Sequence, residues 1–593
     1  MLSFEPPLRE QIFLLERVLH ASEQWQKCSD FSSMDANDAA AVLEAGSRFA
    51  TQRLLPLNAS GDRDGCRREE GEVKTPPGWT DAYRDYVDAG WPSLTVPAGQ
   101  GGQGFPRAVG ALFTENLCAA NLAFSILANV REGVLACLTR FASAEVLALY
   151  AAPLASGQWS GTMCLTEPQA GSDLGLIKTM AKQETSGLWR VSGQKCFISN
   201  GEHDLTPNIV HLVLARTPDA PAGTKGISLF VVSRQQLADG GIGARNGVSL
   251  LGLEQKHGIR ANATCALAFD NAQAHLVGDI GQGLRCMFLL MNGARLEVGV
   301  QSVGLAEIAY QNALQHSRTR LQGRALAGVA QPLLSADPII SHSVVRRTLL
   351  AHKQFIDGGR ALVALVGLLL DKEQHHPDAD ERRRSGDLAA LLTPVVKGYL
   401  SNQAAEHIGA ALCLFGGAGY IIETGMEQVV RDQAICRLYE GTNAIQALDL
   451  LGRKVLADQG ARLKLLGALF EETAVALQQA PRLVPLAASL QTFSRDVGEL
   501  AAALGVDALF NRETVGHAAP AFLELLGHTV MSWMHARIAL AAASEDDTWH
   551  KNKVTMALDY VACIQPRVAS LLQTLRSNAD SVSRLETVDF SAL

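Results

Sequence analysis

The chain has 593 residues, which is too many for one hydrophobic core, and at ~150 residues per domain it predicts about two to four domains. Its residues are 47% hydrophobic and 19% charged, as in a soluble globular protein. The net charge of −8 gives no overall electrostatic attraction for nucleic acid. The 11 Cys form no CxxC pair and no Cys/His cluster at zinc spacing, so we predict no metal site.

The N-terminus and the longest apolar run bear on location. The opening MLSFEPPLREQ lacks the basic start and apolar stretch of a signal peptide. The best candidate for a membrane span, residues 361–370, is only ten residues long and lies between Arg360 and Asp371. We therefore expect a cytoplasmic protein without an integral membrane segment.

Residues 1–158 are predicted to form an N-terminal helical domain. Apolar residues recur at helical spacing over residues 8–19 and 39–49, and two buried helices are expected at 108–130 and 134–152.

Two loops are expected to interrupt these helices. Residues 61–78 are charged and contain Gly and Pro. The Gly-rich segment 91–105, WPSLTVPAGQGGQGF, could cradle a phosphate, but no strand precedes it and no Lys follows at P-loop spacing. We interpret it as a structural loop.

Residues 159–280 are predicted to form an all-β middle domain, either a small barrel or a sandwich. From Trp159 onward, short strand-like runs alternate with turn residues. The expected strands are 160–165, 188–192, 195–199, 209–216, 227–233 and 263–269.

Residues 281–456 are predicted to form a four-helix bundle, because long stretches of helical periodicity return there. The expected order is a helix at 293–320, a Gly/Pro-bearing loop at 322–341, a helix ending at 370, a charged solvent loop at 371–387, a helix from 388 and a helix after Glu440. Residues 457–593 remain helical in pattern and contain no catalytic motif. We interpret them as an added helical domain.

Two motifs of the β region carry small and hydroxyl side chains. In MCLTEPQAGSD (163–173), a strand ends in a turn whose glycine and hydroxyls can approach a ligand closely. In KCFISNG (195–201), Phe197 and Ser199 lie on one face of a strand, which suits a flat heteroaromatic cofactor. Each motif alone also fits an ordinary barrel turn or strand.

A third motif, CLFGGAGY (413–420), follows in the helical region. Gly416 and Gly417 permit close approach of a phosphate or ribose, although a helix end with a Gly turn is the plainer interpretation. The motif is not a GxGxxG after a strand, so we expect no Rossmann site. Arg295 and Arg320 are candidate anion-binding residues on the preceding long helix.

The stretch RDQAICRLYEGTNAIQALDLLGRK (431–454) supplies the candidate catalytic base, Glu440. Gly441 and Thr442 interrupt the apolar pattern just before a helix that Thr442 could cap. Glu440 is therefore expected on a bend, against Leu and Tyr side chains. Partial desolvation there would raise its pKa, which suits a general base. Alternatively, Glu440 is a first-turn residue that stabilises the helix dipole.

Together, the TEPQAGSD, FISNG, FGGAGY and YEGTN motifs strongly resemble those of the acyl-CoA dehydrogenase family, in order and register, over about residues 7–455. The PPLRE and TPPGW segments and the C-terminal block resemble a larger subgroup, with dehydrogenases of fatty acyl-CoAs and of 3-methylthiopropanoyl-CoA. The resemblance implies a mainly α fold: an N-terminal helical domain, a β-barrel-like middle domain, a four-helix bundle and an extra C-terminal helical domain. It also implies FAD bound non-covalently at a homodimer interface.

The resemblance assigns site residues by position. The implied FAD contacts are Met163, Leu165, Thr166, Ser172, Phe197, Ile198, Ser199, Arg320, Gln322, Cys413, Gly416, Gly417, Thr442 and Asn443. The implied acyl-CoA contacts are Ser172, Asn292, Arg295, Tyr439 and Gly441. Arg320, Gln322 and the 413–417 segment would contact the FAD of the partner subunit. Three positions depart from the family pattern: Cys413 replaces a common Gln, Ser199 a common Thr and Asn292 a common Asp.

By this resemblance, Glu440 removes the α proton of an acyl-CoA while the β hydride passes to FAD, giving a trans-2-enoyl-CoA. Electrons would then pass to electron-transfer flavoprotein. We expect a medium- or long-chain substrate in fatty acid β-oxidation, with 3-methylthiopropanoyl-CoA as the alternative. Two rivals remain: an acyl-CoA oxidase, and a flavin-containing relative that binds nucleic acid through its C-terminal block. The acidic residues of that block disfavour the second rival.

Overall fold

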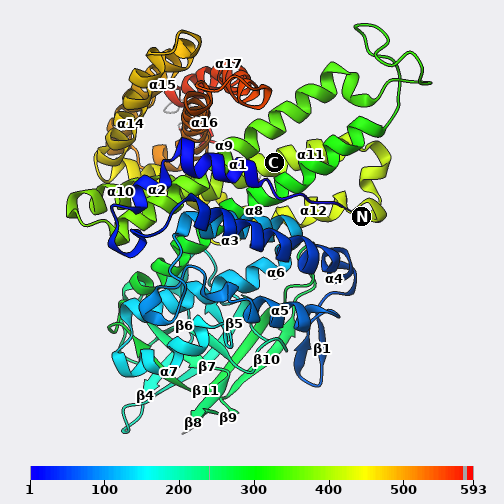
Figure 1. Ribbon diagram of the computed structural model, residues 1–593. Coiled ribbons are helices and arrows are strands. Elements are labelled where there is room, and N and C mark those ends of the chain that lie inside the picture. The colour runs from blue at the N-terminus through cyan, green and yellow to red at the C-terminus, as the bar shows by residue number, and fades with distance from the viewer. Residues whose placement is uncertain are drawn as a thin grey trace. The chain divides into compact units, whose positions relative to one another are not determined.

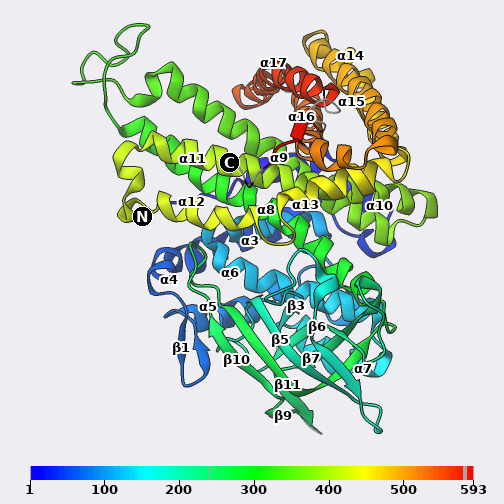
Figure 2. The same ribbon diagram turned by 180° about the vertical axis from the view of Figure 1, so that it is seen from behind.

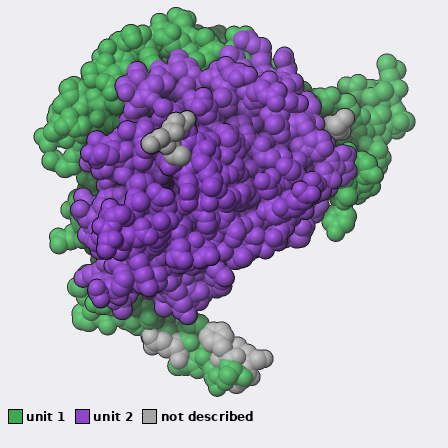
Figure 3. Space-filling model, turned by 90° about the horizontal axis from the view of Figure 1, so that it is seen from below, with its two compact units in different colours: residues 1–44, 106–115, 298–593 green, residues 45–105, 116–297 purple. Residues whose placement is uncertain are grey.

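The computed structural model describes residues 2–238, 241–577, 582, 584–585, 587–589 and 591. The chain forms two compact units, coloured separately in Figure 3. The helical unit contains Met1–Glu44, Pro106–Glu115 and Val298–Leu593, and the β unit contains Ala45–Phe105 and Asn116–Glu297. The two units thus interleave along the sequence, and each is described by itself below.

The β unit is built on a seven-stranded sheet. Its strand order is β10-β11-β5-β4-β6-β3, and β7 pairs with both β11 and β6. The bounds are β3 Ser160–Cys164, β4 Met180–Gln183, β5 Trp189–Ser199, β6 Ile209–Arg216, β7 Ile227–Ser233, β10 Val248–Leu253 and β11 Thr264–Val277. Two small hairpins, β1 Arg67–Glu69 with β2 Glu72–Lys74 and β8 Gln235–Ala238 with β9 Gly241–Arg245, stand apart from this sheet.

The central strands β6 and β7 are almost continuously apolar because both of their faces are buried. Leu212 on one face joins a buried cluster with Tyr150 and Leu154. Val213 on the other face joins a second cluster with Phe230. This alternation places successive side chains of one strand in two separate cores.

The predicted strands were largely confirmed, and β6 and β7 have the expected bounds. The runs at 188–192 and 195–199 form the single strand β5, because Gly193 continues the strand between them with a φ of 153°. Strands β4 and β10 and both small hairpins were not predicted. They are short, and β10 has leucines at exposed as well as buried positions, so none of them shows a clear two-residue period in its sequence.

The helices that contribute to the β unit are α4 Asn58–Asp64, α5 Trp79–Asp88, α6 Arg107–Phe141 and α7 Ala144–Ala155. The prediction of two helices at 108–130 and 134–152 was wrong in its boundaries, since α6 continues to Phe141. Its interruption comes earlier, at Asn121, which has φ −163° and ψ 93°. The Asn121 side chain accepts a hydrogen bond from the Phe124 N–H at 3.1 Å and so caps the second half of the helix.

By length and composition, α6 is the one helix among the described residues that could cross a membrane. However, 67% of its most apolar window is buried inside the structure, as in a core helix.

The helical unit contains the bundle and the C-terminal block (Figure 1). Its remaining helices are α1 Leu8–Phe13, α2 Ala21–Trp25, α3 Ala36–Phe49, α8 Gly283–Thr319, α9 Ser343–His375, α10 Ala379–Pro394, α11 Leu400–Leu414, α12 Met426–Ala434, α13 Asn443–Leu448, α14 Ala461–Gln478, α15 Val484–Phe510, α16 Glu513–Ala542 and α17 Thr548–Arg576. Among these, α3 and α8 continue into the β unit. A π-helical turn, Val395–Tyr399, joins α10 to α11.

The prediction of a charged solvent loop at 371–387 was wrong. Helix α9 continues to His375, and α10 begins at Ala379, where the Asp378 carboxylate accepts a hydrogen bond from the Asp380 N–H. The charged residues lie on helix ends, where pairs such as Lys372–Glu381 link the two helices at 2.5 Å. The charged run therefore belongs mostly to the ends of two helices, and the loop between them is only residues 376–378.

The C-terminal block packs on the bundle within the same unit. Gly527 of α16 lies so close to Tyr399 that an added Cβ would be 2.1 Å from its ring. Lys553 of α17 is buried and pairs with Asp357 of α9 at 2.7 Å, and it also pairs with Glu10 of α1. The block therefore shares a core with the bundle.

Candidate active site

Glu440 lies on a bend between Ile435–Arg437 and α13, as predicted. Its φ of 58° is in the left-handed region, which is costly for a residue with a side chain. Gly441 follows with a φ of 84°. The buried Gln446 amide donates to the Glu440 carbonyl at 3.0 Å and holds this bend closed. The half-buried Glu440 side chain is thus presented on a fixed backbone.

Lys397, in the π-helical turn, fixes the residues that follow Glu440. Its fully buried ammonium donates to the Gly441 carbonyl at 2.6 Å and to Asn443 Oδ1 at 2.8 Å. The Asn443 amide donates in turn to the Ser401 hydroxyl at 3.0 Å. Thr442 occupies the N-cap position of α13, but its side chain makes no capping hydrogen bond. Its exposed hydroxyl is therefore available to a ligand.

The other predicted residue at this bend, Tyr439, donates its hydroxyl to Gln301 of α8. This hydrogen bond ties the bend to the bundle. Sequence reasoning missed Lys397 and Gln301, because a Lys and a Gln on long helices are usually surface residues.

A second group of predicted FAD contacts lies at the other end of α11. The ring of His316 near the end of α8 stacks on Phe415 at 4.4 Å, which brings Arg320 close to the segment with Cys413 and Gly416. Ser401 and Cys413 are 12 residues apart on one helix, or about 18 Å at 1.5 Å per residue. Within one chain, Arg320, Gln322, Cys413, Gly416 and Gly417 are therefore not brought to Glu440.

The β unit carries the third group. Met163 is the penultimate residue of β3, Leu165 and Thr166 follow the strand, and Ser172 is exposed in the next turn. The buried carboxylate of Glu167 pairs with Lys195 Nζ at 2.8 Å. The structure therefore joins the TEPQAGSD and KCFISNG motifs directly. The sequence did not predict this pair.

Phe197 lies in a β-bulge of β5. Two residues, Cys196 and Phe197, face the single Ala266 of β11, and the Phe197 φ is 57°. The bulge leaves the Phe197 ring 65% exposed while Ile198 is buried in the core. Only the backbone of Ile198 can therefore contact a ligand on the exposed face of the strand.

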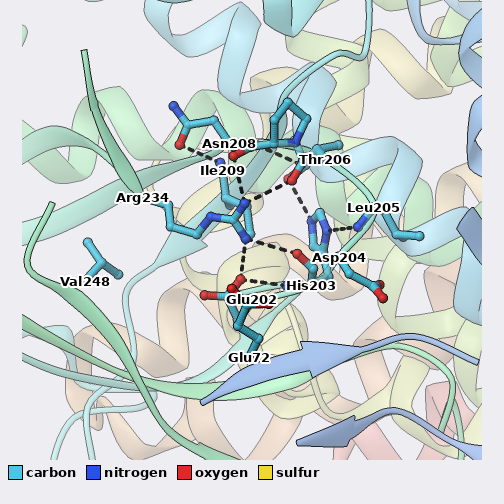
Figure 4. Close-up of polar contacts among 12 residues, drawn as sticks. Glu72, Glu202, His203, Asp204, Leu205, Thr206, Asn208, Ile209, Arg234 and Val248 are labelled. Atoms are coloured by element: carbon cyan, nitrogen blue, oxygen red, sulfur yellow. Dashed lines mark hydrogen bonds and ion pairs between the residues drawn. The ribbon is translucent and has the colours of Figure 1, made fainter. Parts of the chain in front are cut away.

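The turn after β5 is fixed by buried charges, shown in Figure 4. The Glu202 carboxylate accepts hydrogen bonds from Arg234 and Arg245. Arg234 also donates to the carbonyls of His203 and Thr206, both at 3.0 Å. These bonds satisfy the backbone of a turn that would otherwise lose its water partners on burial.

The predicted substrate residues Asn292 and Arg295 lie one turn apart on α8, in the β unit. Arg295 is buried and donates to Asn292 Oδ1 at 3.3 Å.

These residues fit FAD. Gly416 and Gly417 have open space within 4 Å of an added Cβ, so a phosphate or ribose can approach the backbone there. The exposed Phe197 ring and the hydroxyls of Thr166 and Ser199 suit a flat heteroaromatic ring with polar edges.

Four domain descriptions of one family match the chain. They are "Acyl-CoA dehydrogenase, N-terminal domain" at residues 36–158, "Acyl-CoA dehydrogenase, middle domain" at 162–272, "Acyl-CoA dehydrogenase, C-terminal domain" at 281–456 and "Acetyl-CoA dehydrogenase C-terminal like" at 467–586.

Two curated relatives cover nearly the whole chain. A 3-methylmercaptopropionyl-CoA dehydrogenase of Ruegeria pomeroyi is 41% identical and is matched over 92% of each chain. The broad-specificity linear acyl-CoA dehydrogenase FadE5 of Mycobacterium tuberculosis is 31% identical over 100% of each chain.

Solved structures show the same fold. Caenorhabditis elegans ACDH-11 in complex with C11-CoA has a TM-score of 0.79 at 19% identity, covering 94% of this chain and 91% of that chain. Butyryl-CoA dehydrogenase of Megasphaera elsdenii has a TM-score of 0.56 at 22% identity, covering 70% of this chain and 97% of that chain. With its motifs in order and 41% identity along most of its length, the chain belongs to the acyl-CoA dehydrogenase family of FAD-dependent oxidoreductases.

Proposed function

We propose that this enzyme dehydrogenates the α,β bond of a short straight acyl-CoA with Glu440 as the base. The observation that carries the proposal is the bend at Glu440, where a carboxylate stands on a left-handed residue fixed by Gln446 and Lys397. Bound FAD supplies the acceptor for the β hydride. The protein supplies the base and fixes the backbone that carries it.

The role of Glu440 is proton removal. Its carboxylate accepts the α proton of the thioester, and its backbone N–H is proposed to donate to the thioester carbonyl, as the family resemblance implies. That hydrogen bond stabilises negative charge on the carbonyl oxygen and makes the α C–H more acidic. The product is a trans-2-enoyl-CoA.

The relative that is 41% identical favours 3-methylmercaptopropionyl-CoA as the substrate. FadE5, described as a broad-specificity linear acyl-CoA dehydrogenase, is compatible with other straight-chain acyl-CoAs. Medium or long straight chains are therefore kept as the second candidate. The thioether substrate has the same number of chain atoms as pentanoyl-CoA, with sulfur in place of one methylene. Pentanoyl-CoA is therefore a matched probe for recognition of the sulfur.

The test is anaerobic bleaching of the flavin band at about 450 nm. The proposal predicts fastest bleaching by 3-methylmercaptopropionyl-CoA, slower bleaching by pentanoyl-CoA and weak bleaching by octanoyl- and palmitoyl-CoA. Fastest bleaching by octanoyl- or palmitoyl-CoA would transfer the assignment to the second candidate. Absence of bleaching by every acyl-CoA, in protein that carries FAD, would overturn the proposed reaction.

Electron-transfer flavoprotein is the proposed electron acceptor. Turnover should require this carrier or an artificial dye. Hydrogen peroxide formed in air without a carrier would identify an oxidase. Salt-dependent retention on DNA would favour the nucleic-acid-binding rival, which the net charge of −8 disfavours. We also propose a cytoplasmic location, which fractionation of cells expressing the tagged chain would check.

A homodimer is proposed because the FAD contacts of one chain lie at opposite ends of α11. The loop after α8 supports this proposal. It projects from the helices in Figures 1 and 2, and its Leu326 and Leu333 are 100% exposed. The loop is nevertheless ordered, because the buried Asp337 accepts hydrogen bonds from the backbone N–H groups of Ala325 and Gln331 at 2.9 and 2.8 Å. A fixed loop with exposed leucines is typical of a protein interface.

The double variant Leu326→Asp/Leu333→Asp should therefore shift the mass in sedimentation from dimer to monomer. Val475→Asp, at an exposed position of α14, is the matched control. An unchanged dimer in the double variant would remove the loop from the interface.

A further inference from the structure

The proposed mechanism makes no use of a deeply buried ion pair of the β unit, Lys195–Glu167. The two charged atoms are 2.8 Å apart, and the side chains are 0% and 4% exposed. Both residues adjoin segments that the family resemblance places against FAD. A pair buried this deeply is costly to desolvate, so its geometry and its other hydrogen bonds decide what it contributes.

Lys195 reaches the first of these segments through the backbone. Its ammonium donates a second hydrogen bond to the Leu165 carbonyl at 2.9 Å. The peptide between Leu165 and Thr166 is planar and trans, so its C=O and N–H point in opposite directions. By holding the carbonyl, Lys195 therefore directs the Thr166 N–H away from the buried pair. The Cys196 N–H holds the next carbonyl, that of Thr166, at 3.0 Å.

Glu167 closes the second segment, the turn that carries Ser172. Its carboxylate accepts hydrogen bonds from the Lys178 N–H at 2.7 Å and from the Thr179 hydroxyl at 2.6 Å. Residues 167 and 178 are thereby held together, and the turn between them becomes a closed loop with fixed ends. The exposed Ser172 hydroxyl is presented by this loop.

Lys195 also begins the third segment. It pairs with Leu267 of β11, and the bulge that exposes Phe197 starts at the next residue. A shift of Lys195 along the strand would move the bulge, and with it the Phe197 ring and the Ser199 hydroxyl.

The Glu167 carboxyl is ionised at neutral pH. Burial by itself would raise the pKa of the Glu167 carboxyl, but the Lys195 ammonium and the hydrogen bonds from Lys195, Thr179 and Lys178 lower it to about 2. Burial lowers the pKa of Lys195 from its ordinary value, and the Glu167 carboxylate opposes this shift.

We propose that the Lys195–Glu167 pair positions the FAD ring by locking together the Thr166 backbone, the Ser172 loop and the Phe197 bulge. Both are positioning residues, since neither is placed in contact with FAD or substrate. The inference rests on the proposed function, because it assumes that these three segments hold the reacting flavin. Loss of the pair should therefore change the flavin environment and the rate of hydride transfer more than it changes acyl-CoA binding.

The test uses Lys195→Met, Glu167→Gln and the double variant Lys195→Met/Glu167→Gln in the full chain. The double variant leaves no unpaired buried charge and so guards against failure to fold. The matched control is Phe230→Leu, which removes buried volume on a ring that packs on Trp189, at the other end of β5, at 5.1 Å. For each protein we would measure melting temperature, affinity of the apoprotein for FAD, visible absorption and circular dichroism of bound flavin, and anaerobic flavin reduction by acyl-CoA.

The expected result is a shifted flavin spectrum in the pair variants and a fall of about tenfold or more in the rate of flavin reduction, with little change in the acyl-CoA concentration for half saturation. Phe230→Leu should lower the melting temperature while keeping the wild-type spectrum and rate. Pair variants that keep the wild-type spectrum and rate, or that lose activity only in proportion to stability as Phe230→Leu does, would overturn the inference. Failure of the wild-type protein to bind FAD or to be bleached would instead overturn the proposed function.

Discussion

At the scale of single residues, the conformation of Glu440 is the strongest local sign of function. A left-handed residue with a side chain costs roughly 1–3 kcal/mol and persists where the surroundings fix it. Here Gln446 and the following Gly441 do so. Glu440 also lies two residues before Thr442, the N-cap of α13, and is therefore not in the first turn of that helix, so the geometry favours the base over the helix-dipole alternative.

Glu440→Gln should lower the rate of flavin reduction by about 10²–10⁴-fold or more, because an amide cannot accept the α proton. FAD should remain bound at wild-type stoichiometry. Stopped-flow absorbance checks the rate, and Glu423→Gln, an exposed carboxylate of the same unit, is the control that should leave it unchanged. Wild-type turnover by Glu440→Gln would assign the base elsewhere.

Glu167 makes stability depend on acid pH. Its pKa is lowered from an ordinary 4.5 to about 2 in the folded protein, so its contribution is complete above about pH 4.5 and is lost as the pH falls toward 2. In urea unfolding between pH 6 and pH 3, the free energy of unfolding of the wild type should fall more steeply than that of Glu167→Gln. At the acid end the two slopes should differ by up to about 1.4 kcal/mol per pH unit. Parallel pH profiles of the two proteins would show that Glu167 is not held as a buried ion.

At the same scale, the sequence predicted residues that belong to motifs and missed those that hold the motifs in place. Lys195 stands inside KCFISNG, but a Lys is normally a surface residue, and only three-dimensional packing brings Glu167 opposite it. Lys397 was missed for the same reason. The one signal in the sequence for a buried Lys397 was its place as a lone Lys within a strongly apolar stretch, TPVVKGYL, which favours a buried and paired ammonium.

At the scale of elements, long periodic helices and the central strands were predictable because burial on one or both faces imposes their period. The boundaries of these elements were not predictable. Charged residues at 371–387 stay helical because salt bridges and the Asp378 cap stabilise the two helix ends. Asn121 interrupts α6, because its side chain accepts a hydrogen bond from the Phe124 N–H of the same helix. The spacing of apolar residues does not reveal such a bond.

The π-helical turn Val395–Tyr399 serves the active site by turning Lys397 toward the residues after Glu440. Lys397→Met should remove the donor to the Gly441 carbonyl and loosen the start of α13. We expect FAD to remain bound, stability to fall by about 1–3 kcal/mol and the rate of flavin reduction to fall with it. Denaturant unfolding and single-turnover kinetics on the same samples check both effects. Unchanged kinetics despite lower stability would limit Lys397 to a structural role.

At the scale of the whole molecule, the C-terminal block is part of the core of the helical unit. Asp357 of α9 pairs with both Lys353 and Lys553, at 2.8 and 2.7 Å, and it is 3% exposed. The block was expected to be an added domain, because its sequence has helical period but no motif. Its integration depends on single buried residues of α16 and α17 that the period alone does not distinguish.

Lys553→Met should therefore destabilise the whole protein by about 3–5 kcal/mol, since it leaves Asp357 short of one partner in a buried site. Lys551→Met should change stability by less than about 0.5 kcal/mol, because the partner of Lys551, Asp546, is 97% exposed. Truncation after Leu456 removes Lys553 together with α16 and should yield an insoluble or molten bundle. Calorimetry of the two variants and circular dichroism of the truncated chain check these outcomes. A truncated chain that melts cooperatively near the wild-type temperature would show that the bundle folds without the block, and that the Lys553–Asp357 pair contributes little.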